Sequence, residues 1–172
     1  MTNNGEIVSE DGKYHYKTWR KWDGSRPPVI FILANEISGD VTIDRCIRFA
    51  KDWLCGAAIL LPLFALKVKD NRDIVVASKS NEDRLRIIGP ETDIIIYDTF
   101  VENPMSQIIC GWGPFGMLTK RGDAMMRLIR EVGRKPLCID QAPEGFPRPP
   151  SDIHISWNKF PVEYKGPTYV WK

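Results

Sequence analysis

The sequence is poor in the residues that form metal and nucleophile sites. Its 172 residues include only two histidines and four cysteines. The cysteines, Cys46, Cys55, Cys110 and Cys138, form no CxxC pair, and there is no accompanying histidine cluster of the kind that binds zinc. We therefore expect buried, reduced thiols, no metal site and no bound cofactor.

A strong charge of one sign and a long apolar run are also lacking. The net charge of +2 gives no global field toward nucleic acid or an anionic membrane. The longest apolar run, residues 56–66, is too short to span a bilayer, and the first residues lack the pattern of a secretory signal. We expect one cytoplasmic domain over residues 1–172 that spans no membrane, with residues 1–12 flexible.

The two histidines give no support for a hydrolase. His15 and His154 both occupy strand-like positions without a neighbouring serine or cysteine motif. A Ser-His-Asp hydrolase with a G-x-S-x-G turn is therefore not indicated. A structural role is the favoured interpretation for each histidine.

What the sequence does contain is an alternation of apolar strands and amphipathic helices. Strands are predicted at residues 29–34, 57–65, 107–110 and 136–139, and helices at 43–54, 93–102 and 119–132. The β-branched run Ile94–Ile96 makes a strand a competitor for the second of these helices. Residues 13–22 are expected to form an edge strand, residues 67–89 an irregular or short helical excursion, and the tail around Ile153, Ile155 and Trp157 a final strand or extended cover. The pattern predicts an α/β three-layer sandwich with a short, mainly parallel four-stranded central sheet and an N-terminal edge strand or hairpin.

Open sheets of this class bind ligands beyond the carboxyl ends of their strands. The loop after the first buried strand carries Asn35, Glu36 and Asp40, whose amide and carboxylates suit hydrogen bonding and acid–base work. We predict these three as candidate catalytic residues. The competing interpretation is that Asp40 and Thr42 cap the following helix.

The loop after the third buried strand matches G-x-G-x-x-G at Gly111, Gly113 and Gly116. A nicotinamide site is disfavoured because the motif follows the third strand and Pro114 removes an amide. Close backbone approach to a planar or phosphorylated ligand is still expected here. The predicted ligand-binding residues of this loop are Trp112, Gly113, Lys120 and Arg121.

A fourth loop, rich in proline, carries Arg148. A guanidinium on a stiff support suits a phosphate or carboxylate, so Arg148 completes the predicted ligand-binding set. A solvated surface arginine is the alternative. Residues 13–22 also interleave lysines and arginine with Tyr and Trp, as a nucleic-acid surface would, although an edge strand protected by lysines fits as well.

Ordered motifs along residues 13–155 resemble a family of bacterial and phage proteins, domain of unknown function 1643. They comprise Tyr14-His15-Tyr16 with Arg20 and Trp22, Asn35 with Asp40, Arg45-Cys46 with Phe49-Ala50, Leu63-Phe64-Ala65, Gly89-Pro90-Glu91-Thr92-Asp93, Trp112-Gly113 with Gly116, and Gly145 with Pro147-Arg148. The chain departs from the family pattern at Glu36-Ile37, which replace Pro-Ser, and at Pro62, Pro143 and Pro149, which replace Asn, Lys and His. A role carried by the family lysine or histidine cannot operate here.

The order of these motifs is also similar, as a fold-level analogy, to the uracil-DNA glycosylase superfamily, which implies a pocket for a nucleobase. We therefore expect a nucleotide- or nucleobase-binding protein of phage or mobile-element type, with an enzyme acting on nucleotides or modified DNA bases as one form of it. The alternative is a non-catalytic protein that sequesters a nucleotide signal or inhibits a host protein. A third hypothesis is a nucleic-acid-binding module built on residues 13–22.

Overall fold

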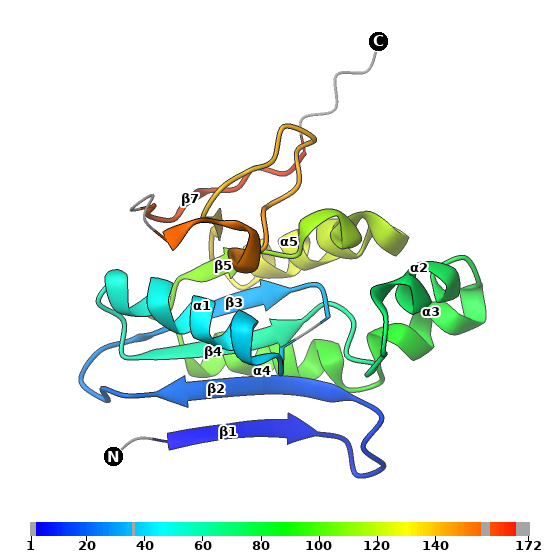
Figure 1. Ribbon diagram of the computed structural model, residues 1–172, viewed down its shortest axis with the longest axis horizontal. Helices are drawn as coiled ribbons and strands as arrows, with labels where there is room; N and C mark the ends of the chain where they lie inside the picture. The colour runs from blue at the N-terminus through cyan, green and yellow to red at the C-terminus, as the bar shows by residue number, and fades with distance from the viewer. Residues whose placement is uncertain (1–2, 36, 156–158, 168–172) are drawn as a thin grey trace.

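The computed structural model describes residues 3–35, 37–155 and 159–167, and its centre is a mixed β-sheet (Figure 1). The strand order is β1-β2-β4-β3-β5-β6-β7. The strands are β1 (Asn3–Val8), β2 (His15–Lys21), β3 (Pro28–Leu33), β4 (Ala57–Pro62), β5 (Ile108–Cys110), β6 (Pro136–Cys138) and β7 (Val162–Glu163). The four strands β4, β3, β5 and β6 are parallel, whereas β1, β2 and β7 run antiparallel to their neighbours. The α/β class is confirmed, and β1 and β2 form the hairpin that was one of the two predicted N-terminal alternatives. The predicted mainly parallel four-stranded sheet is too small, because β2 and β1 on one side and β7 on the other extend it to a mixed sheet of seven strands.

Helices cover both faces of this sheet. They are α1 (Asp40–Asp52), α2 (Asn71–Ala77), α3 (Asn81–Ile88), α4 (Thr92–Glu102) and α5 (Arg121–Glu131), with 3₁₀ helices η1 (Gly113–Lys120) and η2 (Pro150–Asp152). Strand β3 turns Ile30 and Ile32 toward one core, which α4 and α5 complete, and Val29 and Phe31 toward a second core completed by α1. Alternate side chains of one strand thus enter opposite cores, which explains the continuous apolar run of a doubly covered strand.

The N-terminal region differs from expectation. Residues 3–8, where the sequence indicated a flexible start, form β1, and β1 pairs with β2 so that Gly5 lies opposite Trp19. Strand β2 also pairs with β4 and is therefore internal rather than an edge strand. Of the two predicted N-terminal arrangements, an edge strand or a hairpin, the structure has the hairpin, with β1 at the edge of the sheet.

The C-terminal strand also lies elsewhere than predicted. Residues 150–152 form η2, and Ile153 is fully buried where its carbonyl accepts a hydrogen bond from Arg45 of α1. The terminal strand is β7, which pairs with β6. The predicted Trp157 position lies outside the described residues.

The connection between β4 and β5 is helical. Asp70 and Ser80 accept hydrogen bonds from backbone amides at the starts of α2 and α3, as N-cap residues do. Residues 92–102 form helix α4 despite the run Ile94–Ile96, because Ile96 and Phe100 fall on the face that packs into the core. Within the described part of the chain, none of the helices combines the length and apolar character needed to cross a membrane.

Candidate functional site

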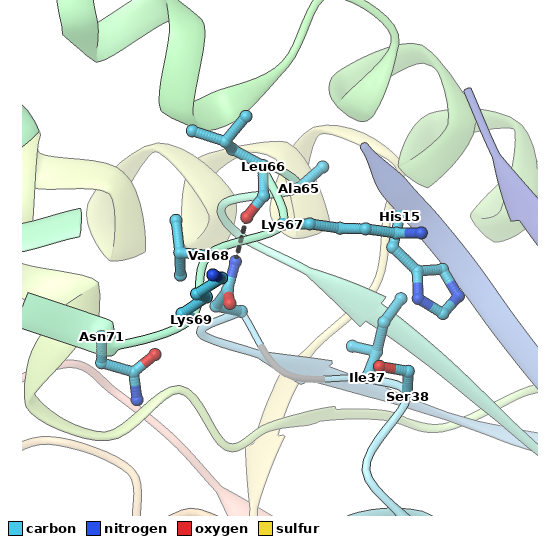
Figure 2. Close-up of a pocket in the computed structure, with 10 residues that line it drawn as sticks. His15, Ile37, Ser38, Ala65, Leu66, Lys67, Val68, Lys69 and Asn71 are labelled. Atoms are coloured by element: carbon cyan, nitrogen blue, oxygen red, sulfur yellow. Dashed lines mark hydrogen bonds between the residues drawn. The ribbon is translucent and has the colours of Figure 1, made fainter. Parts of the chain in front are cut away.

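A polar cavity of about 330 Å³ opens beyond the carboxyl ends of β3 and β4 (Figure 2). We call it the basic cavity. Its lining comprises His15, Asn35, Ile37, Ser38, Ala65, Leu66, Lys67, Val68, Lys69 and Asn71. The parallel strands end at the same edge of the sheet, so loops distant in sequence meet there, as expected for this fold class.

Asn35 holds two of these loops together. Its Nδ2 donates hydrogen bonds to the backbone oxygens of Phe64, at 2.6 Å, and Leu66, at 2.9 Å, and the second of these bonds is the dashed line in Figure 2. Both amide hydrogens are therefore occupied by the loop that follows β4. The described residues supply no hydrogen-bond donor to Oδ1, so that oxygen is the polar atom of Asn35 that can meet a ligand.

His15 forms the wall of the basic cavity on the β2 side. Its Nε2 lies 2.9 Å from Thr18 Oγ1 and 3.3 Å from Glu6 Oε2, which fixes the imidazole between β1 and β2. Burial lowers the pKa of His15, the nearby charge of Lys67 lowers it further, and Glu6 opposes both. Figure 2 shows Lys67 extending toward His15. The neutral imidazole is thus the favoured form beside this cation.

A second cavity of about 300 Å³ adjoins the first. We call it the ring-lined cavity. It is lined by Leu33, Ala34, Asn35, Thr42, Asn71, Gly111, Trp112, Pro114, Phe115, Pro149, Pro150, Ser151 and Asp152. Asn35 and Asn71 border both cavities, which makes the two amide side chains the boundary between a basic and a largely apolar compartment.

Trp112, a predicted ligand-binding residue, borders the ring-lined cavity but is only 3% exposed. It packs edge-on against Tyr164, with ring centroids 6.1 Å apart. A Cβ added at Gly116 would lie 2.1 Å from Trp112 Cδ1, and one at Gly122 would lie 3.0 Å from Nε1. The two glycines thus make room for the indole.

The other glycines of the G-x-G-x-x-G segment have similar structural explanations. A Cβ at Gly111 would lie 2.9 Å from Pro150 Cδ. Gly113 has a φ of +61°, and a Cβ added there would lie 3.0 Å from Pro149 Cγ. The motif therefore packs Trp112 and the proline-rich loop closely together, which requires no dinucleotide.

Three predicted ligand-binding residues, Trp112, Gly113 and Lys120, meet at a third cavity. We call it the apolar chamber. Its volume is about 330 Å³, and its lining comprises Trp112, Gly113, Gly116, Met117, Lys120, Gly122, Asp123, Met126, Phe146, Tyr164 and Pro167. Trp112 borders both this chamber and the ring-lined cavity.

Arg121 has a structural position. Its side chain is buried, its Nε donates a hydrogen bond to the carbonyl oxygen of Leu63 at 2.9 Å, and its Nη2 pairs with Asp93. These contacts join the start of α5 to the end of β4 and the start of α4. Its predicted ligand would have to compete with both partners.

Arg148 is held by Asp140 at the end of β6. Its Nε lies 3.0 Å from Asp140 Oδ2 in an ion pair without hydrogen-bond alignment, and Lys159 Nζ lies 2.9 Å from the other carboxylate oxygen. Asn35 and Trp112 thus share a cavity as expected, while the fourth loop contributes Pro149 and Pro150 to it rather than Arg148.

The remaining predicted catalytic residues do not join Asn35 in the described structure. Asp40 is the exposed first residue of α1; Gly39 is the N-cap, and no side chain caps the helix. Glu36 lies outside the described residues. Among the residues that are described, no three His, Cys, Asp or Glu side chains come together as metal ligands, and all four cysteines are free and buried.

Sequence reasoning missed most of the basic cavity. His15 was assigned a structural role, and Lys67, Lys69, Ser38 and Asn71 were not selected. The available signal was the position of Lys67 and Lys69 soon after a strand end, a place where the fold class puts ligands.

Comparison with known proteins bears on the chain as a whole. Residues 15–151 match the family model described as "Protein of unknown function (DUF1643)", a range that contains most of the residues lining the three cavities. No curated protein matches the chain. Because the match covers well over half of the sequence, this protein belongs to the DUF1643 family.

Proposed function

We propose that this protein binds a nucleotide across the basic and ring-lined cavities. The observation that carries the proposal is the shared border at Asn35 and Asn71, which places a cationic compartment directly beside an apolar one. A nucleotide has the same division, with a phosphate at one end and a planar base at the other. The phosphate would occupy the basic cavity and the base the ring-lined cavity.

The charges of the basic cavity support the phosphate end. Lys67 and Lys69 line it, and the described lining residues include no carboxylate. The ammonium groups supply donors and positive charge, and Ser38 adds a hydroxyl.

The shape of the ring-lined cavity supports the base end. Apolar walls are provided by Pro114, Phe115, Pro149 and Pro150, and Trp112 also lines the cavity. Small-molecule sites are commonly lined by apolar and aromatic groups, with a few polar groups that fix orientation. The amide side chains of Asn35 and Asn71 are placed to serve that purpose for the ribose or the base edge.

Calorimetric titration with AMP, ADP, adenosine, free bases and short DNA tests the proposal. We expect phosphorylated nucleotides to bind, adenosine to bind more weakly, and the double variant Lys67→Gln/Lys69→Gln to lose at least tenfold in affinity for AMP. Lys135→Gln, which removes a positive charge at an exposed position outside both cavity linings, is the matched control. Absence of heat across the whole panel with folded protein would contradict nucleotide binding.

A second candidate function, binding to another protein, is favoured by one surface. On α4, Ile94, Tyr97 and Val101 are 61%, 46% and 57% exposed and recur at helical spacing. Asp98 and Glu102 lie beside them, and the helix contains no lysine or arginine. This chemistry fits a partner whose apolar stripe is flanked by basic residues.

Protein binding and nucleotide binding are separable by mutation. Ile94→Ser with Val101→Ser should abolish recovery of such a partner while AMP binding persists. Retained recovery would exclude the α4 surface.

A further inference from the structure

The apolar chamber shares Trp112 with the ring-lined cavity of the proposed nucleotide site, and it has a different chemistry. Large apolar side chains dominate its lining: Trp112, Met117, Met126, Phe146 and Tyr164. Its volume of about 330 Å³ is at the lower end of the range for small-molecule sites. The chamber can therefore accept a compact, ring-containing molecule.

The aromatic walls are held in place without a ligand. Trp112 fills the space cleared by Gly116 and Gly122 and packs edge-on against Tyr164. Tyr164 in turn donates its hydroxyl hydrogen to the carbonyl oxygen of Gly145 at 3.0 Å, and its backbone amide donates to Pro136 at 2.9 Å. A site whose walls are already ordered loses less conformational entropy on binding.

The two methionines supply the adaptable part of the lining. Met126 is 4% exposed and lies deep in the chamber, whereas Met117 is 55% exposed and lies toward solvent. Unbranched thioether side chains adjust to ligand shape and make favourable contacts with aromatic rings. This combination of fixed rings and flexible methionines favours an aromatic ligand over a chain-like one.

The polar groups of the lining carry both signs of charge. Lys120 is the N-cap residue of α5 and Asp123 lies in the first turn of that helix, and both side chains are exposed at the chamber. An anionic group of a ligand would be attracted to the Lys120 ammonium and to the helix start, and a cationic group to the Asp123 carboxylate. A ligand that carries one charge of each sign satisfies both residues.

From these observations we infer that the apolar chamber is a second binding site, specific for a small aromatic molecule that carries both a carboxylate and an amine. The ring occupies the cavity that Trp112, Phe146 and Tyr164 line. The carboxylate pairs with Lys120 and the amine with Asp123. The site shares Trp112 with the ring-lined cavity and uses none of the residues of the basic cavity.

Equilibrium dialysis with three indoles tests the inference: tryptophan, indole-3-propionate, which lacks the amine, and tryptamine, which lacks the carboxylate. We expect tryptophan to bind most tightly. Lys120→Asn should weaken the binding of tryptophan and indole-3-propionate at least tenfold and leave the binding of tryptamine unchanged. Asp123→Asn should weaken the binding of tryptophan and tryptamine at least tenfold and leave the binding of indole-3-propionate unchanged.

The choice of Lys120→Asn removes a common ambiguity. Lys120 has a φ of +56°, a left-handed conformation that asparagine adopts more readily than lysine. The substitution therefore removes the charge while easing backbone strain, and a loss of binding cannot be assigned to a damaged fold. Lys135→Gln is the control for a change in net charge.

A blocking variant tests the location of the site. Met117→Trp adds bulk at the solvent side of the chamber and should abolish tryptophan binding, whereas Met105→Trp, at an 82% exposed position outside its lining, should not. AMP binding is measured in parallel and should be unaffected by Met117→Trp. Failure of AMP binding alone would count against the nucleotide proposal and leave the chamber standing.

Three results would overturn the inference. The first is no binding of any of the three indoles, and the second is tryptophan binding that survives Met117→Trp. The third involves a chain that ends at Pro167, which lines the chamber. If only this shortened chain binds tryptophan, the residues after Pro167 compete for the chamber, and it is not a ligand site.

Discussion

His15 shows at the scale of one residue how a position can serve both the fold and a cavity. Its ring contacts Thr18 and Glu6 on the strand side and borders the basic cavity on the other. Burial acts against the charged imidazolium here, and Lys67 adds like-charge repulsion. The residue is therefore sensitive to pH in a way that the sequence alone does not reveal.

We predict that stability decreases as the pH falls through the range just below 6.5, the ordinary pKa of histidine. The pKa of His15 is lowered on folding, so in this range the unfolded chain binds more protons than the folded one, and protonation favours unfolding. The stabilisation is fully present above the unfolded pKa and is lost as the pH falls, with a slope of at most about 1.4 kcal/mol per pH unit for one proton. Urea unfolding at pH 7.5, 6.5 and 5.5 measures it.

The control for this prediction is His15→Gln, which keeps a hydrogen-bonding group near Thr18 and removes the titration. The slope in this range should become shallower in the variant. An identical slope in both proteins would show that other groups cause it.

Gly116 illustrates a constraint set by one atom. The space where its Cβ would lie is filled by the Trp112 ring, at 2.1 Å from Cδ1. Gly116→Ala must displace a buried indole, so we expect a loss of roughly 1–3 kcal/mol, the usual cost of overpacking a core. Chemical denaturation measures the loss.

Gly24→Ala is the matched control, since the nearest atom there is Cε of the flexible Lys21 side chain, at 3.3 Å. Its effect should stay below about 0.5 kcal/mol, as is usual for surface substitutions. Equal effects at the two positions would contradict the packing explanation.

At the scale of elements, Arg121 connects three that are distant in sequence. The contacts to Leu63 and Asp93 span 58 and 28 residues along the chain. Asp93 is 62% exposed, so water screens the ion pair, whereas the bond to the Leu63 carbonyl is buried. The hydrogen bond to the Leu63 carbonyl should therefore contribute more to the free energy of unfolding than the ion pair with Asp93.

This comparison gives a third prediction. Arg121→Met should lower the free energy of unfolding by roughly 2–4 kcal/mol, because it leaves the Leu63 carbonyl and Asp93 without their partner. Asp93→Asn should cost less, about 1 kcal/mol, because an exposed ion pair contributes little. A larger effect for Asp93→Asn than for Arg121→Met would reverse this order of importance.

Most elements that enter the core were predictable from the sequence. Strands β3, β4, β5 and β6 and helices α1, α4 and α5 were predicted within a few residues, because each strand is apolar and each helix has a face that packs into the core. Strand β1 has a polar, glycine-containing sequence, and β7 has two residues. These two strands form because they pair with β2 and β6, and their own sequences do not show the apolar pattern that predicts a strand.

At the scale of the whole molecule, some site residues are indicated by their place in the sequence and others only by the tertiary structure. Asn35 was predictable because it is a polar residue directly after a buried strand. Lys67 and Lys69 also follow a strand end, but a charged segment is equally typical of solvated surface, and only the folded sheet brings it beside His15. The glycine-rich turn before Arg121 predicts a ligand contact, and only the tertiary structure reveals that its Nε and Nη2 already have partners.

A nucleotide that bridges the two cavities should stabilise the whole fold, because its partners come from several loops. Asn35 follows β3, Asn71 begins α2, and Pro149 belongs to the proline-rich loop. A ligand that binds only the folded protein raises the free energy of unfolding by roughly 2.7 kcal/mol at a hundred times its Kd. For a chain of this size this corresponds to an increase in Tm of roughly 5–10 °C.

Thermal unfolding with AMP therefore gives the fourth prediction. The increase in Tm should grow with AMP concentration, be smaller with adenosine, and disappear in Lys67→Gln/Lys69→Gln at concentrations that saturate the unmodified protein. High salt should reduce the effect of AMP more than that of adenosine, because the lysine–phosphate contacts are exposed to screening ions. An equal increase in the double variant would place the nucleotide elsewhere on the molecule, since the basic cavity would then contribute nothing to its binding.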